Sequence, residues 1–355
     1  MERDTIDRLK NGQLEFPPLT FRPVSLEPKG GNIDMIVEAT WKDKKAIFAV
    51  ECKASSTPRM LRDAAARAKA YAQRENLEPM IVVPFLGRER LDELEREGVS
   101  GVDLCGNGIV VAPGNFAVSR TGAPNRFRNS APIKNIYQKN SSIVGRVFLA
   151  QPRYAAVREI QREIKRRNLP IWPPISLATV SKALKGLEGD LIVSRDNAGI
   201  SLVQPDKLLE KLAANFVWKK GRASVRAKLT AEGDQLLKVL AKTANALNLP
   251  LVATGVASVS QYAVMQRGPV LAVYCTEPEA LLERAGGTVT DRFPNIEIFE
   301  ADEPFFYFDA RTERDFRRAS PLQVYLELMA GDKRDSETAE QVRTFILNNV
   351  GSQFK

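Results

Sequence analysis

The sequence predicts a multidomain protein of the α/β and α+β classes, and three observations support this prediction. The chain has 355 residues, which is enough for two or three domains of about 150 residues each. Strand-like and helix-like apolar patterns alternate through the first third, whereas the middle third has three helical patterns followed by a hairpin. A segment rich in Asn, Ser, Gly and Pro separates these two thirds and is typical of a linker. The expected divisions are an α/β domain, a basic linker, a helical domain and an α+β domain over residues 1–113, 114–141, 142–218 and 219–355.

The composition excludes several mechanisms. The chain contains no histidine, so it has no Ser-His-Asp or Cys-His relay and no zinc site that uses histidine. Its three cysteines, Cys52, Cys105 and Cys275, are scattered and never spaced as CxxC, which predicts neither a disulfide framework nor a zinc knuckle. The N-terminus is charged, and no apolar run approaches the ~18 residues of a membrane span. We therefore expect a reduced, cytoplasmic protein without a membrane partner.

The net charge of +9 is concentrated in the middle of the chain. Residues 1–129 carry a net charge of +2, residues 130–228 carry +12, and residues 229–355 carry −5. No acidic residue occurs from Leu104 to Arg158. A basic surface gains affinity for phosphates through counterion release, although a solvated face or a basic linker produces the same pattern. The charge distribution therefore favours a nucleic-acid partner but does not establish one.

In the first domain, two strands joined by a tight polar turn are expected at residues 32–41 and 46–54. Period-two alternation puts Glu51 and Lys53 on one face of the second strand, and Asp34 on the first strand can project beside Glu51. Two carboxylates suit a hard cation, and a neighbouring lysine can orient a metal-activated water or stabilise a phosphoryl transition state. The sequence therefore predicts that Asp34 and Glu51 bind Mg²⁺ or Mn²⁺ and that Lys53 is catalytic.

The elements around this motif resemble the restriction-endonuclease-like PD-(D/E)XK superfamily. An initial helix precedes the strand pair, Thr57 and Pro58 begin an Ala-rich helix, and a buried strand follows at residues 79–85. This αβββαβ order and the three motif residues match the superfamily over residues 1–113, which implies metal-dependent hydrolysis of DNA phosphodiesters. The alternative is a salt-bridge cluster at a strand end in a domain that cleaves nothing, because fold does not imply function.

The middle segment predicts three helices followed by a hairpin. The helices are expected at residues 142–150, 154–168 and 177–189, and the hairpin turns at residues 196–199. The apolar face of the third helix consists of Leu177, Val180, Leu184 and Leu187. Three helices and a hairpin make a winged helix-turn-helix, and residues 179–193 resemble the recognition helix and wing strand of bacterial DNA-binding regulators.

This resemblance implies contact with double-stranded DNA. We expect hydroxyl side chains near the start of the third helix to contact bases or sugars and the basic side chains to contact phosphates. The candidate DNA-binding residues are Ser176, Thr179, Ser181, Lys182, Lys185 and Arg195. The alternative is a winged helix that binds protein, or an ordinary three-helix core. A homodimer would suit a winged helix that reads a palindrome.

The C-terminal segment resembles the AbiEi-type antitoxins, which are regulators of type IV toxin–antitoxin systems. The resemblance is carried by Pro205-Asp206 with the leucines that follow, by the Thr254-Gly255 turn and by residues 321–328, and it extends over about residues 142–350. It implies an α+β fold similar to minimal nucleotidyltransferases and a toxin or another protein as partner.

Two features of this segment limit its chemistry. The strand expected at residues 270–274, which follows the turn at Gly255, carries no carboxylate, so nucleotidyl transfer is not expected. The net charge of −5 favours protein contact, regulation or dimerisation. The aromatic run at residues 304–308 is expected to be a buried strand.

Two functions therefore compete. In the first, the winged helix positions DNA and Asp34, Glu51 and Lys53 hydrolyse it with Mg²⁺. In the alternative, the protein is a non-catalytic transcriptional regulator or antitoxin, and its nuclease-like domain serves only for binding or as a scaffold.

Overall fold

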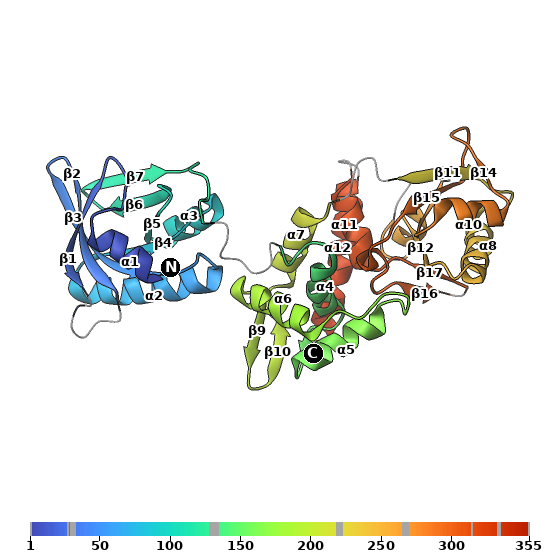
Figure 1. Ribbon diagram of the computed structural model, residues 1–355, viewed down its shortest axis with the longest axis horizontal. Coiled ribbons are helices and arrows are strands. Elements are labelled where there is room, and N and C mark those ends of the chain that lie inside the picture. The colour runs from blue at the N-terminus through green and yellow to red at the C-terminus, as the bar shows by residue number, and fades with distance from the viewer. Residues whose placement is uncertain are drawn as a thin grey trace. The chain divides into compact units, whose positions relative to one another are not determined.

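The chain forms two compact units, residues 1–132 and 133–355, which Figure 1 shows in a computed structural model. Each unit mixes helices and strands. Among the described residues, no helix is both long and apolar enough to cross a membrane. The structure describes residues 2–26, 28, 33–127, 135–217, 223–264, 270–313, 315–331 and 335–353.

The first unit is built on a seven-stranded sheet whose strands follow one another in chain order. The pairs β3–β4 and β4–β5 are parallel, and all other neighbouring pairs are antiparallel. Its elements are α1 (Glu2–Lys10), β1 (Thr20–Leu26), β2 (Met35–Trp41), β3 (Lys44–Cys52), α2 (Pro58–Glu75), β4 (Glu78–Val83), α3 (Arg88–Arg96), β5 (Ser100–Asp103), β6 (Gly108–Ala112) and β7 (Phe116–Arg120). From α1 to β4 this is the expected αβββαβ order.

Helix α2 begins and packs as its sequence predicts. The Thr57 hydroxyl caps it by accepting a hydrogen bond from the Met60 N–H, and Pro58 occupies the first turn, where its missing N–H costs nothing. Its small residues Ala64, Ala65, Ala68 and Ala72 are buried, which lets the helix lie close to the sheet.

The first unit extends beyond the limit expected from the sequence. Strand β7 lies in the segment assigned to the linker, yet it pairs with β6 along its whole length. Phe116 begins this strand, is buried, and packs edge-on against Trp41. The linker therefore does not begin at residue 114, because apolar contacts retain this segment in the sheet.

The second unit starts with a helical part that contains a three-stranded sheet in the order β8-β10-β9. Gly199, where β10 begins, has φ +129°, and a Cβ atom there would lie 2.5 Å from the Tyr154 carbonyl oxygen, so the close pairing of β10 with β8 requires glycine. The elements of this part are η2 (Lys139–Ser141), α4 (Ser142–Ala150), β8 (Arg153–Tyr154), α5 (Val157–Arg167), α6 (Leu177–Gly189), β9 (Val193–Asp196), β10 (Gly199–Leu202) and α7 (Pro205–Asn215).

The three expected helices and the hairpin are all observed, with two differences. Strand β8 was not expected, because two residues are too few to show a period. On α6, Val180, Leu184 and Leu187 are buried, but Leu177 is exposed. Leu177 is the first residue of the helix, and its side chain is not part of the hydrophobic core that buries the other three.

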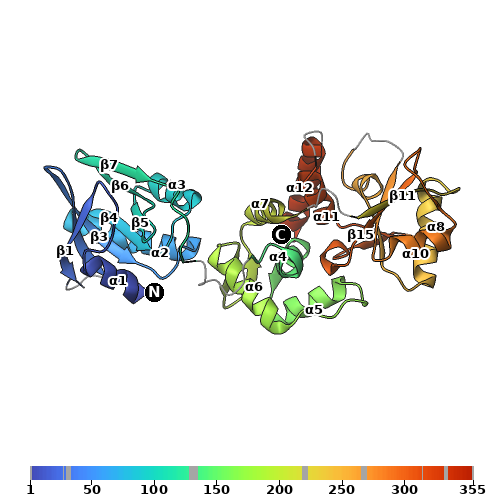
Figure 2. The ribbon, with the colours of Figure 1, turned by 45° about the horizontal axis from the view of Figure 1, so that its top comes forward.

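The described residues in the rest of the second unit form a seven-stranded mixed sheet in the order β14-β11-β15-β13-β12-β17-β16, together with five α-helices and the 3-10 helix η3. Helices α8 and α10 pack together against this sheet (Figure 2). The elements are β11 (Ser224–Lys228), α8 (Gly233–Ala246), β12 (Leu251–Thr254), α9 (Val256–Val259), β13 (Leu271–Cys275), α10 (Pro278–Ala285), β14 (Thr288–Val289), β15 (Ile296–Glu300), η3 (Pro304–Phe306), β16 (Arg311–Glu313), β17 (Phe316–Arg318), α11 (Pro321–Met329) and α12 (Asp335–Ser352).

One hydrophobic core joins the helical part to the C-terminal helices. It includes Val147 of α4, Leu187 of α6, Leu208 of α7, Val324 of α11 and Val342 of α12, and α11 and α12 lie between α7 and the sheet (Figure 1). The sequence predicts a separate domain from residue 219, whereas this core runs across that position. Residues 218–222 themselves lie outside the described residues.

The aromatic run at residues 304–308 is buried as expected, but it is not a strand. Pro304–Phe306 forms the 3-10 helix η3, and Tyr307 and Phe308 follow in a turn. Phe306 and Tyr307 both contact the ring of Tyr274. The expectation of a strand was wrong. A run of aromatic residues indicates burial, and a tight turn that packs against the core buries them as well as a strand does.

Candidate functional site

The structure brings together the three residues of the predicted metal site. Asp34 immediately precedes β2, Glu51 lies in β3, and Lys53 immediately follows β3. The Lys53 Nζ is 2.7 Å from Glu51 Oε2 and 3.9 Å from Asp34 Oδ2. The Cys52 N–H donates a 2.6 Å hydrogen bond to Asp34 Oδ2. Period-two alternation in β3 therefore produces the expected juxtaposition.

A fourth residue, Arg67, belongs to this cluster and was not found from the sequence. It lies in α2, and its Nε is 3.0 Å from Glu51 Oε1. Glu51 is only 3% exposed, so a buried carboxylate carries one cation on each of its oxygens. The cationic partners offset the cost of burying this charge. The only signal for Arg67 was that its helix directly follows the strand that carries Glu51.

In this arrangement the cluster fits a divalent cation poorly. A magnesium ion needs carboxylate oxygens that can face it, whereas both oxygens of Glu51 are bound by Arg67 and Lys53. Asp34 Oδ2 accepts the Cys52 N–H, and Lys53 Nζ also donates to the Cys52 carbonyl at 2.7 Å. Among the described residues, no group of three or more Asp, Glu or Cys side chains is placed to hold a metal. The geometry shows carboxylates neutralised by protein cations.

The predicted DNA-binding residues lie on α6 and on the hairpin that follows it. Lys182 and Lys185 are exposed on α6, opposite its buried face. Ser176 caps the helix, because its Oγ accepts the Thr179 N–H at 3.1 Å and lies 2.9 Å from Thr179 Oγ1. Ser181 is partly buried. The two hydroxyls at the start of α6 therefore serve first to order the helix.

The sixth predicted residue, Arg195, lies in β9 and is 48% exposed. Its Nε is 2.9 Å from Glu188 Oε1, so the hairpin is tied to the end of α6 by an ion pair. The arginine of this pair is exposed, whereas the Glu188 side chain is only 16% exposed.

A second set of basic side chains lies on α5, the helix before α6, and was not singled out from the sequence. Only Arg166 in this set forms an ion pair, with Glu163 Oε1 at 2.6 Å, within the described part of the chain. These helices, with the hairpin β9–β10, appear in green in Figure 1. The exposed basic residues of α5 are Arg158, Arg162, Lys165 and Arg166.

The turn at Gly255, where the sequence was searched for nucleotidyl-transfer residues, holds β12 and α11 together. Gly255 follows β12 with φ +55° and starts the short helix α9. Ser258 is fully buried, and its hydroxyl donates to the Ala253 carbonyl at 2.6 Å and accepts the Ala319 N–H at 3.1 Å. The hydroxyl therefore joins β12 to the start of α11.

A carboxylate that the sequence did not assign lies beside this turn. Glu327 of α11 accepts hydrogen bonds from Thr254 Oγ1 at 2.5 Å, from the Tyr274 hydroxyl at 2.6 Å and from Gln323 Nε2 at 2.9 Å. By accessible surface Glu327 is only partly buried, yet the protein packed around its carboxyl group raises the pKa of that group above its ordinary value. This network connects α11 to the ends of β12 and β13.

In the second unit, a segment of helices and a hairpin carries exposed basic side chains on α5, α6 and β9. This segment packs against an α+β part through a shared hydrophobic core. Residues 201–348 match the family model described as "Transcriptional regulator, AbiEi antitoxin, Type IV TA system". The match covers less than half of the chain and begins in β10, so α4, α5 and α6 lie outside it. No curated protein and no solved structure matches the chain.

Proposed function

We propose that this protein is a DNA-binding transcriptional regulator of the type IV antitoxin kind. The observation that carries this proposal is the match of residues 201–348 to a family described as transcriptional regulators and antitoxins. The basic helical segment immediately before the matched region supplies a surface suited to DNA. The family description also makes a cognate toxin the expected protein partner.

In this proposal α4, α5, α6 and the hairpin β9–β10 act as a winged helix-turn-helix. Helix α6 enters the major groove as the recognition helix, and the hairpin is the wing. The hydrophobic core fixes the buried face of α6 through Val180, Leu184 and Leu187, which leaves Lys182 and Lys185 on the opposite, exposed face.

The basic residues have the role of phosphate contacts. Lys182, Lys185 and Arg195 neutralise the DNA backbone, and Ser176, Thr179 and Ser181 lie near enough to the start of α6 to contact base edges or sugars. Because each neutralised phosphate releases condensed counterions, affinity should fall steeply as salt rises.

The test measures binding of the full chain to a fluorescent 30-base-pair duplex of mixed sequence by anisotropy at several salt concentrations. Replacing both Lys182 and Lys185 by Ala should weaken binding at every salt concentration. It should also reduce the slope of log K against log salt by about 2, because each phosphate that a lysine neutralises adds about 0.9 to that slope.

The matched control replaces Lys242 and Arg284, which are exposed on α8 and α10, by Ala. It removes the same charge from the same unit and should leave the salt slope unchanged. Equal loss in both variants would mean that only net charge matters, and no loss in either would exclude α6 from the interface.

Sedimentation velocity on the same samples tests the expected homodimer.

A second candidate function is hydrolysis of DNA by the first unit. It is favoured by the convergence of Asp34, Glu51 and Lys53 at one end of β3. It requires Arg67 to leave Glu51, because that guanidinium occupies one of the two carboxylate oxygens.

Supercoiled DNA incubated with the protein and Mg²⁺ or Mn²⁺ tests this candidate. Cleavage by the wild type that disappears in Glu51→Ala and Lys53→Ala would support it, and Arg67→Ala should then retain or increase it. Wild-type protein that leaves supercoiled DNA intact while binding it would reject hydrolysis and retain the regulator.

A further inference from the structure

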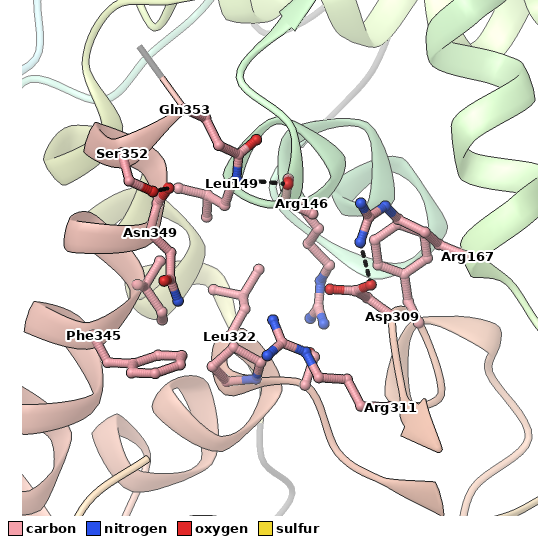
Figure 3. Close-up of a pocket in the computed structure, with 15 residues that line it drawn as sticks. Arg146, Leu149, Arg167, Asp309, Arg311, Leu322, Phe345, Asn349, Ser352 and Gln353 are labelled. Carbon is pink, nitrogen blue, oxygen red and sulfur yellow. Dashed lines mark hydrogen bonds and ion pairs between the residues drawn. The ribbon is translucent and has the colours of Figure 1, made fainter. Parts of the chain in front are cut away.

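A cavity of about 310 Å³ lies in the second unit where α4 and α5 meet α11 and α12. This volume is at the lower end of the range for small-molecule pockets. Figure 3 shows the guanidinium groups of Arg146 and Arg311 reaching into the same hollow, with Asp309 beside Arg167 at one side. The cavity is therefore lined by three arginines from different segments of the chain.

The first unusual feature of the cavity is Arg146 of α4. Its side chain is almost fully buried, and its hydrogen bonds go to neutral acceptors: Ser142 Oγ at 3.2 Å, the Phe305 carbonyl at 3.0 Å and Gln323 Oε1 at 2.9 Å. Burial lowers the pKa of Arg146 to about 10, so the group stays charged at neutral pH. Within the described residues it forms no ion pair, and the Glu327 carboxylate reaches it only through Gln323. A buried charge without a directly paired counterion is costly.

The second feature is the excess of positive charge around the hollow. Arg167 is neutralised, because it pairs with Asp309 and with Glu163. Arg311 is exposed and stacks its guanidinium near the ring of Tyr262, and no carboxylate of the described residues pairs with it. Three arginines and one aspartate leave the lining with a net charge of +2.

The remaining lining is suited to a ligand with both a charged and an apolar end. The N-terminus of α11 opens into the cavity at Ser320 and Pro321, and its dipole favours negative charge. An apolar wall is formed by Leu149, Leu322 and Phe345. Asn349 of α12 adds a side-chain amide to the lining.

We propose that this cavity binds a small phosphate monoester, with the phosphate between Arg146 and Arg311 and the organic group against Leu149, Leu322 and Phe345. Guanidinium groups bind phosphate through paired, charge-assisted hydrogen bonds. A dianion would give Arg146 the direct ion pair that it lacks among the described residues and would match the net charge of +2. This inference is independent of DNA binding, because its readout is ligand binding alone.

Isothermal titration calorimetry of the full chain with adenosine 5′-monophosphate, adenosine and inorganic phosphate tests the proposal. The monoester should bind, the uncharged nucleoside should bind at least tenfold more weakly, and inorganic phosphate should bind more weakly than the monoester. Absence of monoester binding at millimolar concentration, or equal binding of adenosine, would overturn the proposal. Equal binding of phosphate and monoester would overturn the role of the apolar wall.

Arg311→Gln is the decisive variant, because Arg311 is exposed and its loss should not disturb folding. It should weaken monoester binding at least tenfold, whereas Arg292→Gln, which removes an exposed arginine in a loop outside the cavity lining, should leave affinity unchanged. Arg146→Lys keeps a buried cation but loses the guanidinium fork, and it should also weaken binding. Equal affinity of wild type and Arg311→Gln would place the ligand elsewhere.

Discussion

The hydroxyl of Tyr274 donates a 2.6 Å hydrogen bond to Oε1 of Glu327, and this contact links β13 to α11. The same carboxylate oxygen accepts a hydrogen bond from Gln323 Nε2. The side-chain oxygen of Gln323, Oε1, accepts a hydrogen bond from Arg146 of α4. A continuous polar chain therefore runs from the sheet of the second unit to its helical part. Tyr274, Gln323 and Arg146 are buried. Breaking any hydrogen bond of this network therefore leaves a polar group that water cannot easily reach.

Replacing Tyr274 by Phe should destabilise the second unit by about 1.5–3 kcal/mol, the usual value for a hydrogen bond to a charged group. Tyr154→Phe is a matched control, because the Tyr154 hydroxyl donates to the neutral Val147 carbonyl at 3.2 Å and its removal should cost about 1 kcal/mol. Urea-dependent amide hydrogen exchange of β13 and α4 measures both. Equal costs would show that the charge on Glu327 adds nothing to the bond.

The raised pKa of Glu327 predicts a pH dependence of stability. Protein packed around the carboxyl group raises its pKa in the folded state above the ordinary value of 4.5, so the folded state binds a proton more tightly than the unfolded chain. The resulting stabilisation is complete below about pH 4.5 and is lost as pH rises through the folded pKa.

Glu327→Gln has no proton to bind and should lack this contribution. The free energy of unfolding of the wild type, relative to that of Glu327→Gln, should therefore decrease as pH rises from about 4 to 8. Urea unfolding of both proteins across this range checks it. Parallel curves for the two proteins would contradict the prediction.

Local patterns in the sequence predicted the parts of the structure that depend on near neighbours. Alternation along β3 placed Glu51 and Lys53 together, and the Thr57 and Pro58 pair begins α2 as expected. Contacts between distant residues left no such pattern. Arg67 reaches Glu51 from another element, and Glu327 meets Thr254 across 73 residues.

The same reason explains the errors in domain limits. Strand β7 has a turn-rich sequence around it, and only its pairing with β6 and the burial of Phe116 keep it in the sheet. Helices α11 and α12 complete the core of α4 and α7, although α11 begins only at Pro321, far along the chain from α4 (Ser142–Ala150) and α7 (Pro205–Asn215). A boundary drawn from composition does not detect such packing.

The carboxylate cluster of the first unit predicts unequal roles for its two cations. Lys53 is 12% exposed and faces the buried Glu51, whereas the Arg67 side chain is 43% exposed. Removing a buried partner costs about 3 kcal/mol or more, and removing an exposed one costs at most about 1 kcal/mol. Lys53→Met should therefore destabilise the first unit much more than Arg67→Met, as measured by urea-dependent hydrogen exchange of β3. Similar losses would mean that Arg67 stabilises Glu51 as much as Lys53 does, which would contradict the prediction.

The three cysteines should differ sharply in reactivity. Burial raises the pKa of the Cys275 thiol to about 11, so about one molecule in a thousand carries the thiolate at pH 8. Cys52 is also buried, and only Cys105 is partly exposed. Titration of the native protein with a chromogenic disulfide at about pH 8 should release one rapid equivalent, and denaturant should release all three. Cys105→Ser should abolish the rapid equivalent while leaving the other two, and a rapid equivalent that persists in this variant would show that β3 or β13 opens readily.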